Sequence, residues 1–275
     1  MTEMQEAFIC TTCGTQFPPS DSPPDACAIC EEERQYVSRL GQSWTTLGRM
    51  ARTHHNAFGQ EEPSLLGIGT EPPFAIGQRA LLLRLPGGNI LWDCISLIDP
   101  ATIEIVRALG GLAAIAISHP HYYATMVDWS RAFDAPVFLH EADRRWVMRP
   151  DPAIQFWSGE THTLAPGATL IRCGGHFAGG TVLHWAQGAG GYGALLSGDI
   201  VQVGPDRKVS FMRSYPDLIP LDATSVQRIA DVLAPWPFDP IYGAWWERVI
   251  RTGGKQAMEV SVRRYIDAIS RPPSD

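Results

Sequence analysis

Hydrophobic residues form short, regularly spaced runs from residue 78 onward, and these runs predict strands that alternate with helices. The runs RALLLRL and NILWDCI flank Pro-Gly-Gly, which predicts a β-hairpin. The run LAAIAIS has the length of a buried strand, and the segment ATIEIVRALGG before it has helical spacing and a glycine stop. Further strands are predicted at APVFLH, ATLIRCGG, TVLHWA, YGALLSGD and DPIYGA, and further helices at ATMVDWSRAF, DATSVQRIADVLA and from Trp245 to about Ser270.

The earlier part of the chain has a different pattern. Residues 8–36 are rich in proline and serine and hold too few apolar residues for a core of their own. Residues 37–75 contain two candidate short helices and a stretch rich in glycine and proline. We therefore expect a cysteine-containing module at 1–36, a connecting segment at 37–75 and a main domain at 76–275. Sheets covered by helices make that main domain α+β.

Composition narrows the class of protein. Of the 275 residues, 45% are hydrophobic and 19% are charged, which is enough for a buried core. The formal net charge is −7 and the basic residues form no cluster, which argues against a nucleic-acid partner. No apolar run reaches the ~20 residues that span a bilayer, and the first residues do not resemble a signal peptide. We expect a cytoplasmic protein with a small-molecule substrate and no membrane partner.

Four of the six cysteines occur as two CxxC pairs near the start of the chain. Cys10, Cys13, Cys27 and Cys30 have the spacing C-x2-C-x13-C-x2-C. Each pair lets two thiolates of one tight turn face a single ion, and four thiolates form a closed, structural site. Zinc is the default ion, and thiolate ligation also suits iron. A redox dithiol fits less well, because neither pair opens a helix in a βαβ unit. The same module could hold a protein partner or a second copy of the chain.

Three histidines and an aspartate follow predicted strands in the main domain: His119, His121, His176 and Asp199. Loops that follow strands often carry chemistry on a rigid frame. The segments ISHPHYYATMVDWSRAFDAPVFLHEAD, GGHFAGGTVLHW and ALLSGDI occur in this order after the hairpin. Together they resemble the signature segments of the metallo-β-lactamase superfamily. The resemblance covers roughly residues 76–250 and implies an αββα sandwich.

The resemblance also implies ligands for a first metal ion. By position, His119, His121 and His176 correspond to the histidines of that ion. Asp199 corresponds to the carboxylate that bridges two metals in dinuclear members, and here it would bind the ion or act as a base. Three histidines with an open position suit catalytic zinc, whereas two histidines and a carboxylate suit non-haem iron. We expect one zinc or iron ion at this site.

The ligands of a second ion are missing from the sequence. The family pattern is H-x-H-x-D-H, but Tyr123 and Ala124 stand where its Asp and last His are expected. Asp128 lies about two helical turns beyond His121 and is no obvious substitute. The late family histidine is expected near IYGAWW, where the chain has Gly243, Ala244 and Trp245. Any enzyme built on this pattern therefore works with one ion.

The function that fits best is a mononuclear metal-dependent hydrolase of an ester, thioester or amide. A second hypothesis is a binding or scaffold protein whose degenerate cleft holds a ligand without turning it over. An iron dioxygenase acting on a sulfur substrate is a variant of the first. Nucleic-acid processing is a weaker alternative, because superfamily nucleases use two metals and the chain is acidic.

The other histidines have structural interpretations. His54 and His55 are expected on a short helix, where adjacent side chains point about 100° apart and do not readily bind one ion. His140, His162 and His184 are interpreted as ordinary strand and loop residues. If the resemblance holds, several aromatic residues lie near the cleft, where they would line a pocket or fill space: Tyr122, Tyr123, Phe177, Trp245 and Trp246.

Overall fold

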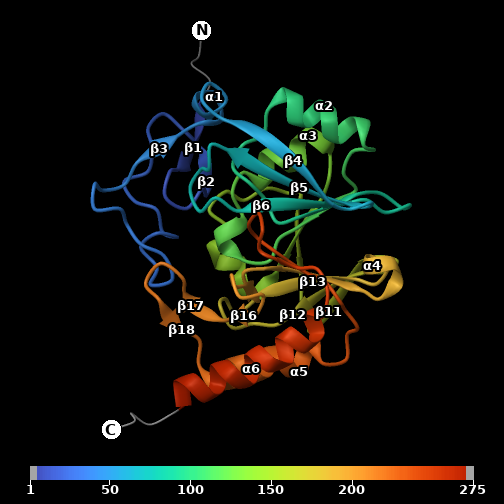
Figure 1. The fold of residues 1–275 in the computed structure, drawn as a ribbon. Helices are drawn as coiled ribbons and strands as arrows, with labels where there is room; N and C mark the ends of the chain where they lie inside the picture. Colours follow the sequence, from blue (N-terminus) through green and yellow to red (C-terminus); the bar gives the residue numbers. More distant parts are fainter. Residues whose placement is uncertain (1–4, 271–275) are drawn as a thin grey trace. The chain divides into compact units, whose positions relative to one another are not determined.

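The computed structural model describes residues 5–270, which fall into two compact units (Figure 1). Within that range, the first unit comprises residues up to 139 together with 143–156. The second comprises 140–142 and residues from 157 onward. No helix of the described range is long and apolar enough to cross a membrane.

The first unit is built on a seven-stranded sheet in the order β10-β9-β8-β7-β6-β5-β4. Its strands are β4 (His55–Glu62), β5 (Leu65–Glu71), β6 (Arg79–Leu83), β7 (Ile90–Trp92), β8 (Ala114–Ala116), β9 (Val137–His140) and β10 (Ile154–Trp157). Strands β4 to β7 pair antiparallel, and β7, β8 and β9 pair parallel. The predicted hairpin is confirmed, since Leu81 pairs with Trp92 across β6 and β7.

Helices connect the parallel strands of this sheet. They are α2 (Pro100–Ala108) and α3 (Met126–Phe133), with short 3₁₀ turns at Pro120–Tyr122 and Glu141–Trp146. Helix α2 begins where Asp99 accepts a hydrogen bond from the Thr102 amide, with proline at the first helical position. Helix α3 ends at Asp134, whose φ of 52° is left-handed. Both helices were predicted from the spacing of their apolar residues.

A small three-stranded sheet, in the order β2-β1-β3, carries the first cysteine pair. Its strands are β1 (Glu6–Cys10), β2 (Gln16–Ser20) and β3 (Trp44–Thr45), and the short helix α1 (Leu47–Met50) follows. Ile9 of β1 is fully buried in a cluster with Met50 and Leu97. The module therefore shares apolar packing with the rest of the first unit.

The second unit is built on a six-stranded sheet in the order β11-β12-β13-β14-β19-β20. Its strands are β11 (Thr161–Ala165), β12 (Ala168–Arg172), β13 (Thr181–Trp185), β14 (Ala194–Gly198), β19 (Ile241–Gly243) and β20 (Val249–Ile250). Two smaller pairs are β15 (Gln202–Val203) with β16 (Val209–Ser210), and β17 (Met212–Ser214) with β18 (Ile219–Pro220). The helices are α4 (Gly188–Gly191), α5 (Ala223–Leu233) and α6 (Gly254–Ser270).

Helices α5 and α6 lie side by side in Figure 1, and their apolar faces enter the core of the second unit. Ile229 of α5 and Met258 of α6 are buried there with Ile241 of β19. Helix α5 begins at Asp222, whose carboxylate accepts from the Ser225 amide. The amphipathic pattern of this segment predicted the helix, and the structure confirms it.

Two expectations about secondary structure are wrong. Residues 37–75 hold two strands of the large sheet and only a four-residue helix, and His55 begins β4 rather than lying on a helix. The segment after Trp245 first forms β20, paired with β19, and the helix begins only at Gly254. In both places tertiary pairing with a hydrophobic neighbour strand overrides a weak local pattern.

Candidate metal centres

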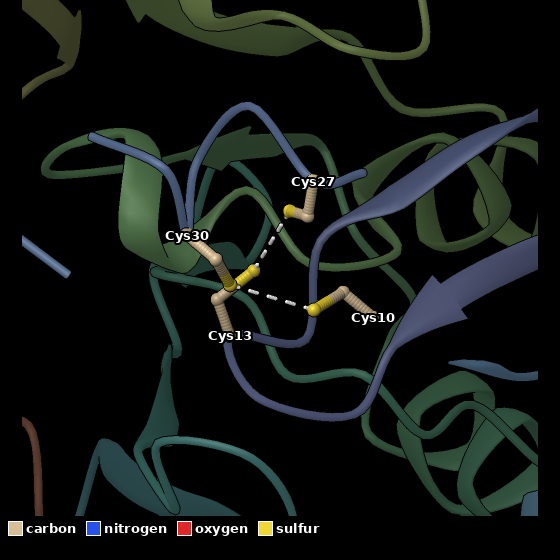
Figure 2. Close-up of side chains that lie close together, drawn as sticks. All are labelled: Cys10, Cys13, Cys27 and Cys30. Atoms are coloured by element: carbon tan, nitrogen blue, oxygen red, sulfur yellow. Dashed lines mark hydrogen bonds between the residues drawn. The ribbon is translucent and has the colours of Figure 1, made fainter. Parts of the chain in front are cut away.

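Four cysteine thiols converge on one point in the first unit. The Sγ atoms of Cys10 and Cys30 lie 3.6 Å apart, as do those of Cys13 and Cys27 (Figure 2). All four sulfurs lie within 4.8 Å of one another. Sulfurs about 2.3 Å from a single tetrahedral ion would be about 3.8 Å apart, so the spacing fits an ion bound by all four.

Electrostatics favours a cation among these thiols. All four side chains are at most 1% exposed. Burial raises the pKa of the Cys13 thiol, whereas hydrogen bonds from the other three thiols lower the pKa of Cys10. Several buried thiolates repel one another unless a positive charge lies between them, so full ionisation of the cluster requires a metal ion.

The backbone around the first pair forms a tight turn. The Gly14 amide donates to the Cys10 carbonyl at 2.9 Å, and Gly14 has a φ of 81°, which favours glycine. The second pair is turned by the Cys30 amide, which donates to the Cys27 carbonyl at 2.9 Å. The Gln42 side-chain amide donates to Cys10 Sγ at 3.0 Å, an interaction that favours the thiolate form.

The loop after β8 carries His119 and His121, both buried in the first unit. Their rings lie edge to face with centroids 5.2 Å apart, and the ring of Tyr122 packs 4.4 Å from that of His119. His119 precedes the 3₁₀ turn and has extended backbone, whereas His121 lies within the turn. This change of backbone direction brings two histidines separated by one residue onto the same side of the loop.

A hydrogen-bonded chain fixes the ring of His119. The Ser118 amide donates to Asp93 Oδ1 at 2.8 Å, and the Ser118 hydroxyl lies 2.8 Å from His119 Nδ1. Ser118 thus joins the carboxyl of Asp93 to the ring of His119 through its amide and its hydroxyl.

Asp93 itself is a residue that the sequence did not single out. It is 1% exposed, and burial raises the pKa of its carboxyl to about 7 despite the hydrogen bonds from Ser118. Its only signal in the sequence is an acidic residue inside the apolar run NILWDCI. An acidic residue in such a run is expensive to bury and is worth singling out for that reason.

The second unit contains His176 and Asp199, which are 2% and 3% exposed. His176 Nδ1 lies 3.1 Å from the Met212 carbonyl, which can only accept, so Nδ1 carries the proton and Nε2 the lone pair. Tyr215 links the two residues, since its ring packs 5.6 Å from that of His176 and its hydroxyl donates to the Asp199 carbonyl at 2.6 Å. Burial, reinforced by the Asp199 carboxylate, raises the pKa of Tyr215, so the hydroxyl stays a donor.

Four of the other five histidines have structural partners. His140 Nε2 bonds the Gly159 carbonyl at 3.1 Å, and His184 Nε2 bonds the Pro237 carbonyl at 2.6 Å. His162 stacks on Trp157, and His54 Nδ1 bonds the Thr53 hydroxyl at 2.8 Å. These contacts agree with the structural interpretation of all four.

The structure therefore gathers the four cysteines, pairs His119 with His121, and links His176 to Asp199 through Tyr215. Two sets of side chains could each hold a metal ion: Cys10, Cys13, Cys27 and Cys30, and His119, His121 and His176.

Comparison with known proteins gives one close relative and many similar folds. No family model matches the chain. The uncharacterized protein YmaE of Bacillus subtilis (strain 168) is 49% identical over 266 residues, which cover 96% of this chain and 97% of YmaE.

Solved structures with the same fold are distant in sequence. That of VMB-1 at pH 5.5 has a TM-score of 0.60 at 12% identity and covers 78% of this chain and 99% of its own. The metallo-β-lactamase FIM-1 from Pseudomonas aeruginosa, in its mono-zinc form, has a TM-score of 0.58 at 14% identity and covers 79% and 97%. The predicted α+β metallo-β-lactamase fold, preceded by a four-cysteine module, is confirmed.

Proposed function

The chain belongs to the YmaE family, and from its metallo-β-lactamase fold we propose that it is a mononuclear metal-dependent hydrolase of an ester, thioester or amide. His119, His121 and His176 would bind one ion, zinc or iron. The observation that carries this proposal is this set of three buried histidines, whose ring nitrogens could hold a metal ion. The Met212 carbonyl accepts from Nδ1–H of His176, which places the lone pair of that ring on Nε2.

The residues of the chain have separable roles in such a reaction. A bound zinc ion supplies a water molecule acidified toward a pKa of ~7 and a Lewis acid for the carbonyl group. Ser118, itself bonded to Asp93, holds the ring of His119 in place. The Met212 carbonyl holds His176 in the tautomer that has its lone pair on Nε2. Asp199 would orient the water and take its proton, while Tyr215 fixes the backbone at that carboxylate.

A single ion is proposed because the positions where the family has the ligands of a second ion are occupied here by residues of other types. Tyr123 and Ala124 offer no metal-binding group of the expected kind, and both are buried. FIM-1 shows that this fold is also found with one zinc ion. The four cysteines would hold a second, structural ion.

We also propose a cytoplasmic location, because all six cysteines of the chain are free and disulfides are rare in that compartment.

The test combines metal content with hydrolysis. Protein purified anaerobically and loaded with zinc or iron should contain two ions per chain, and His119→Ala or His176→Ala should lower this to one. Both variants should lose turnover of p-nitrophenyl esters, acyl thioesters and a β-lactam amide by ~100-fold or more. His54→Ala is the matched control, because His54 bonds Thr53. Wild-type protein with only one ion per chain would refute the proposal.

The missing second ligand set supports one other candidate, a protein that binds a ligand at these residues without turning it over. This candidate predicts that His119→Ala and His176→Ala leave every measurable activity unchanged. Isothermal titration with the same esters and thioesters would then show binding without product.

A further inference from the structure

The four-cysteine module, which the structure describes over residues 5–36, is hydrogen-bonded directly to the loop that carries His119 and His121. The backbone amide of Gln16, three residues after Cys13, donates to the carbonyl of Ala124 at 3.2 Å. Ala124 has a φ of 42° and is 4% exposed, so this left-handed residue is buried against its neighbours. A single backbone hydrogen bond therefore joins the segment after the first cysteine pair to the histidine loop.

A buried polar network reinforces this contact. The Gln16 side chain donates to Asp128 Oδ2 at 2.7 Å and accepts from Arg149. Arg149 also pairs with Asp128 at 3.0 Å, which closes a three-membered network. Gln16 and Arg149 are 3% and 7% exposed. Hydrogen bonds to charged groups in such surroundings are among the stronger ones in proteins.

A second path runs through the segment after Asp93. The Ser96 hydroxyl donates to the Gly14 carbonyl at 3.1 Å, and the Ser96 carbonyl accepts from the Thr125 hydroxyl at 3.0 Å. A Cβ on Gly14 would lie 2.5 Å from the Ser96 hydroxyl oxygen, so the turn after the first cysteine pair fits closely against this segment. Both paths begin at residues 14–16 and end at residues 124–128.

From these contacts we infer that the four-cysteine module is a positioning element for the histidine loop. An ion on the four cysteines fixes the turn at Gly14, and Gln16 then holds Ala124 and Asp128. Loss of that ion frees residues 14–16 and loosens the loop. Gln16 and Asp128 are positioning residues in this scheme and touch no ion. The consequence for metal binding by His119 and His121 rests on the proposed function, whereas the mechanical link does not.

Hydrogen–deuterium exchange of the full chain tests the link. Cys30→Ser removes one ligand of the ion on the four cysteines, and Gln16→Ala removes the side-chain bonds to Asp128 and Arg149 while keeping the backbone bond to Ala124. Each should raise exchange of the peptide covering residues 118–126 by about 5-fold, the effect of losing roughly 1 kcal/mol of hydrogen bonding. The effects in the double variant should be less than additive, because Cys30→Ser already loosens the turn from which Gln16 reaches Asp128. Gln5→Ala is the matched control in the same module, since the Gln5 side chain bonds Asp21 at an exposed position and should leave the loop unchanged.

A spectroscopic readout separates positioning from a general loss of stability. In cobalt-loaded protein, Gln16→Ala should alter the d–d bands of the ion on the histidines and keep the thiolate-to-cobalt charge-transfer bands. If Cys30→Ser fails to fold, as judged by exchange in β6 and β7 of the same unit, the Gln16→Ala data alone decide. Unchanged loop exchange in Gln16→Ala, or additive effects in the double variant, would overturn the inference. If the variants change hydrogen exchange of the loop as expected but no ion binds to the histidines, only the proposed function is refuted.

Discussion

Among single residues, Asp93 couples stability to pH. Burial raises the pKa of its carboxyl from 3.8 to about 7, so the folded chain keeps a proton that the unfolded chain releases in this range. Its contribution to stability is therefore full below pH ~4 and falls as pH rises to ~7, by at most about 1.4 kcal/mol per pH unit.

Asp93→Asn should flatten this part of the stability profile. Asparagine still accepts from the Ser118 amide and tolerates the φ of 60° at this position. The free energy of unfolding is measured by urea titration of metal-free protein across the range. Asp134→Asn, at an exposed position with a φ of 52°, should keep the wild-type slope. If Asp93→Asn keeps the wild-type slope of unfolding free energy against pH, another group causes the pH dependence.

The candidate metal ligands were predictable from the sequence because chemistry restricts the residue types, and the polar residues that contact them or their loop were not. Cysteine pairs and histidines after strands are rare enough to be recognised. Ser118 and Gln16 are ordinary polar residues whose partners lie 25 and 112 residues away, at Asp93 and Asp128. Only the folded chain brings such partners together.

At the level of elements, Lys255 closes the end of helix α5. Its Nζ donates to the carbonyls of Leu233, Ala234 and Trp236 at 2.7, 2.9 and 3.0 Å. These carbonyls belong to the last turn and the residues after it, where a cation also complements the helix dipole.

Lys255→Met should lower the free energy of unfolding by about 1–2 kcal/mol, because it keeps the alkyl chain and removes the donor. The effect is read from the urea midpoint of the full chain. Lys208→Met is the matched control, as Lys208 pairs only distantly with Asp206, at 3.8 Å. Equal effects of the two substitutions would show that the helix end needs no cation.

Elements with a strong apolar period were predicted correctly, and those without one were missed. Helix α5 and the buried strand β8 have clear patterns. Strand β4 reads HNAFGQEE, which has no apolar alternation, and it forms because β5 supplies the hydrogen-bonding edge. Strand β20 has two residues and depends on β19 in the same way.

For the whole molecule, an ion on the four cysteines should contribute stability that burial alone does not supply. Cys13→Ser should remove one ion per chain and lower Tm by roughly 10 °C, since several kcal/mol of metal binding is linked to folding of the first unit. Elemental analysis and a thermal scan check both parts. Cys173→Ser, which also alters a buried cysteine, should keep the metal content. If Cys13→Ser keeps the wild-type metal content, the four cysteines do not bind an ion.

The hydrogen bond between Gln16 and Ala124 also limits how the protein could be redesigned. Introducing Tyr123→Asp and Ala124→His would restore the family pattern on paper. Position 124, however, is 4% exposed and its carbonyl accepts from the Gln16 amide, so a histidine there needs room that its buried surroundings must yield. We expect the double substitution to give a destabilised chain without a second ion.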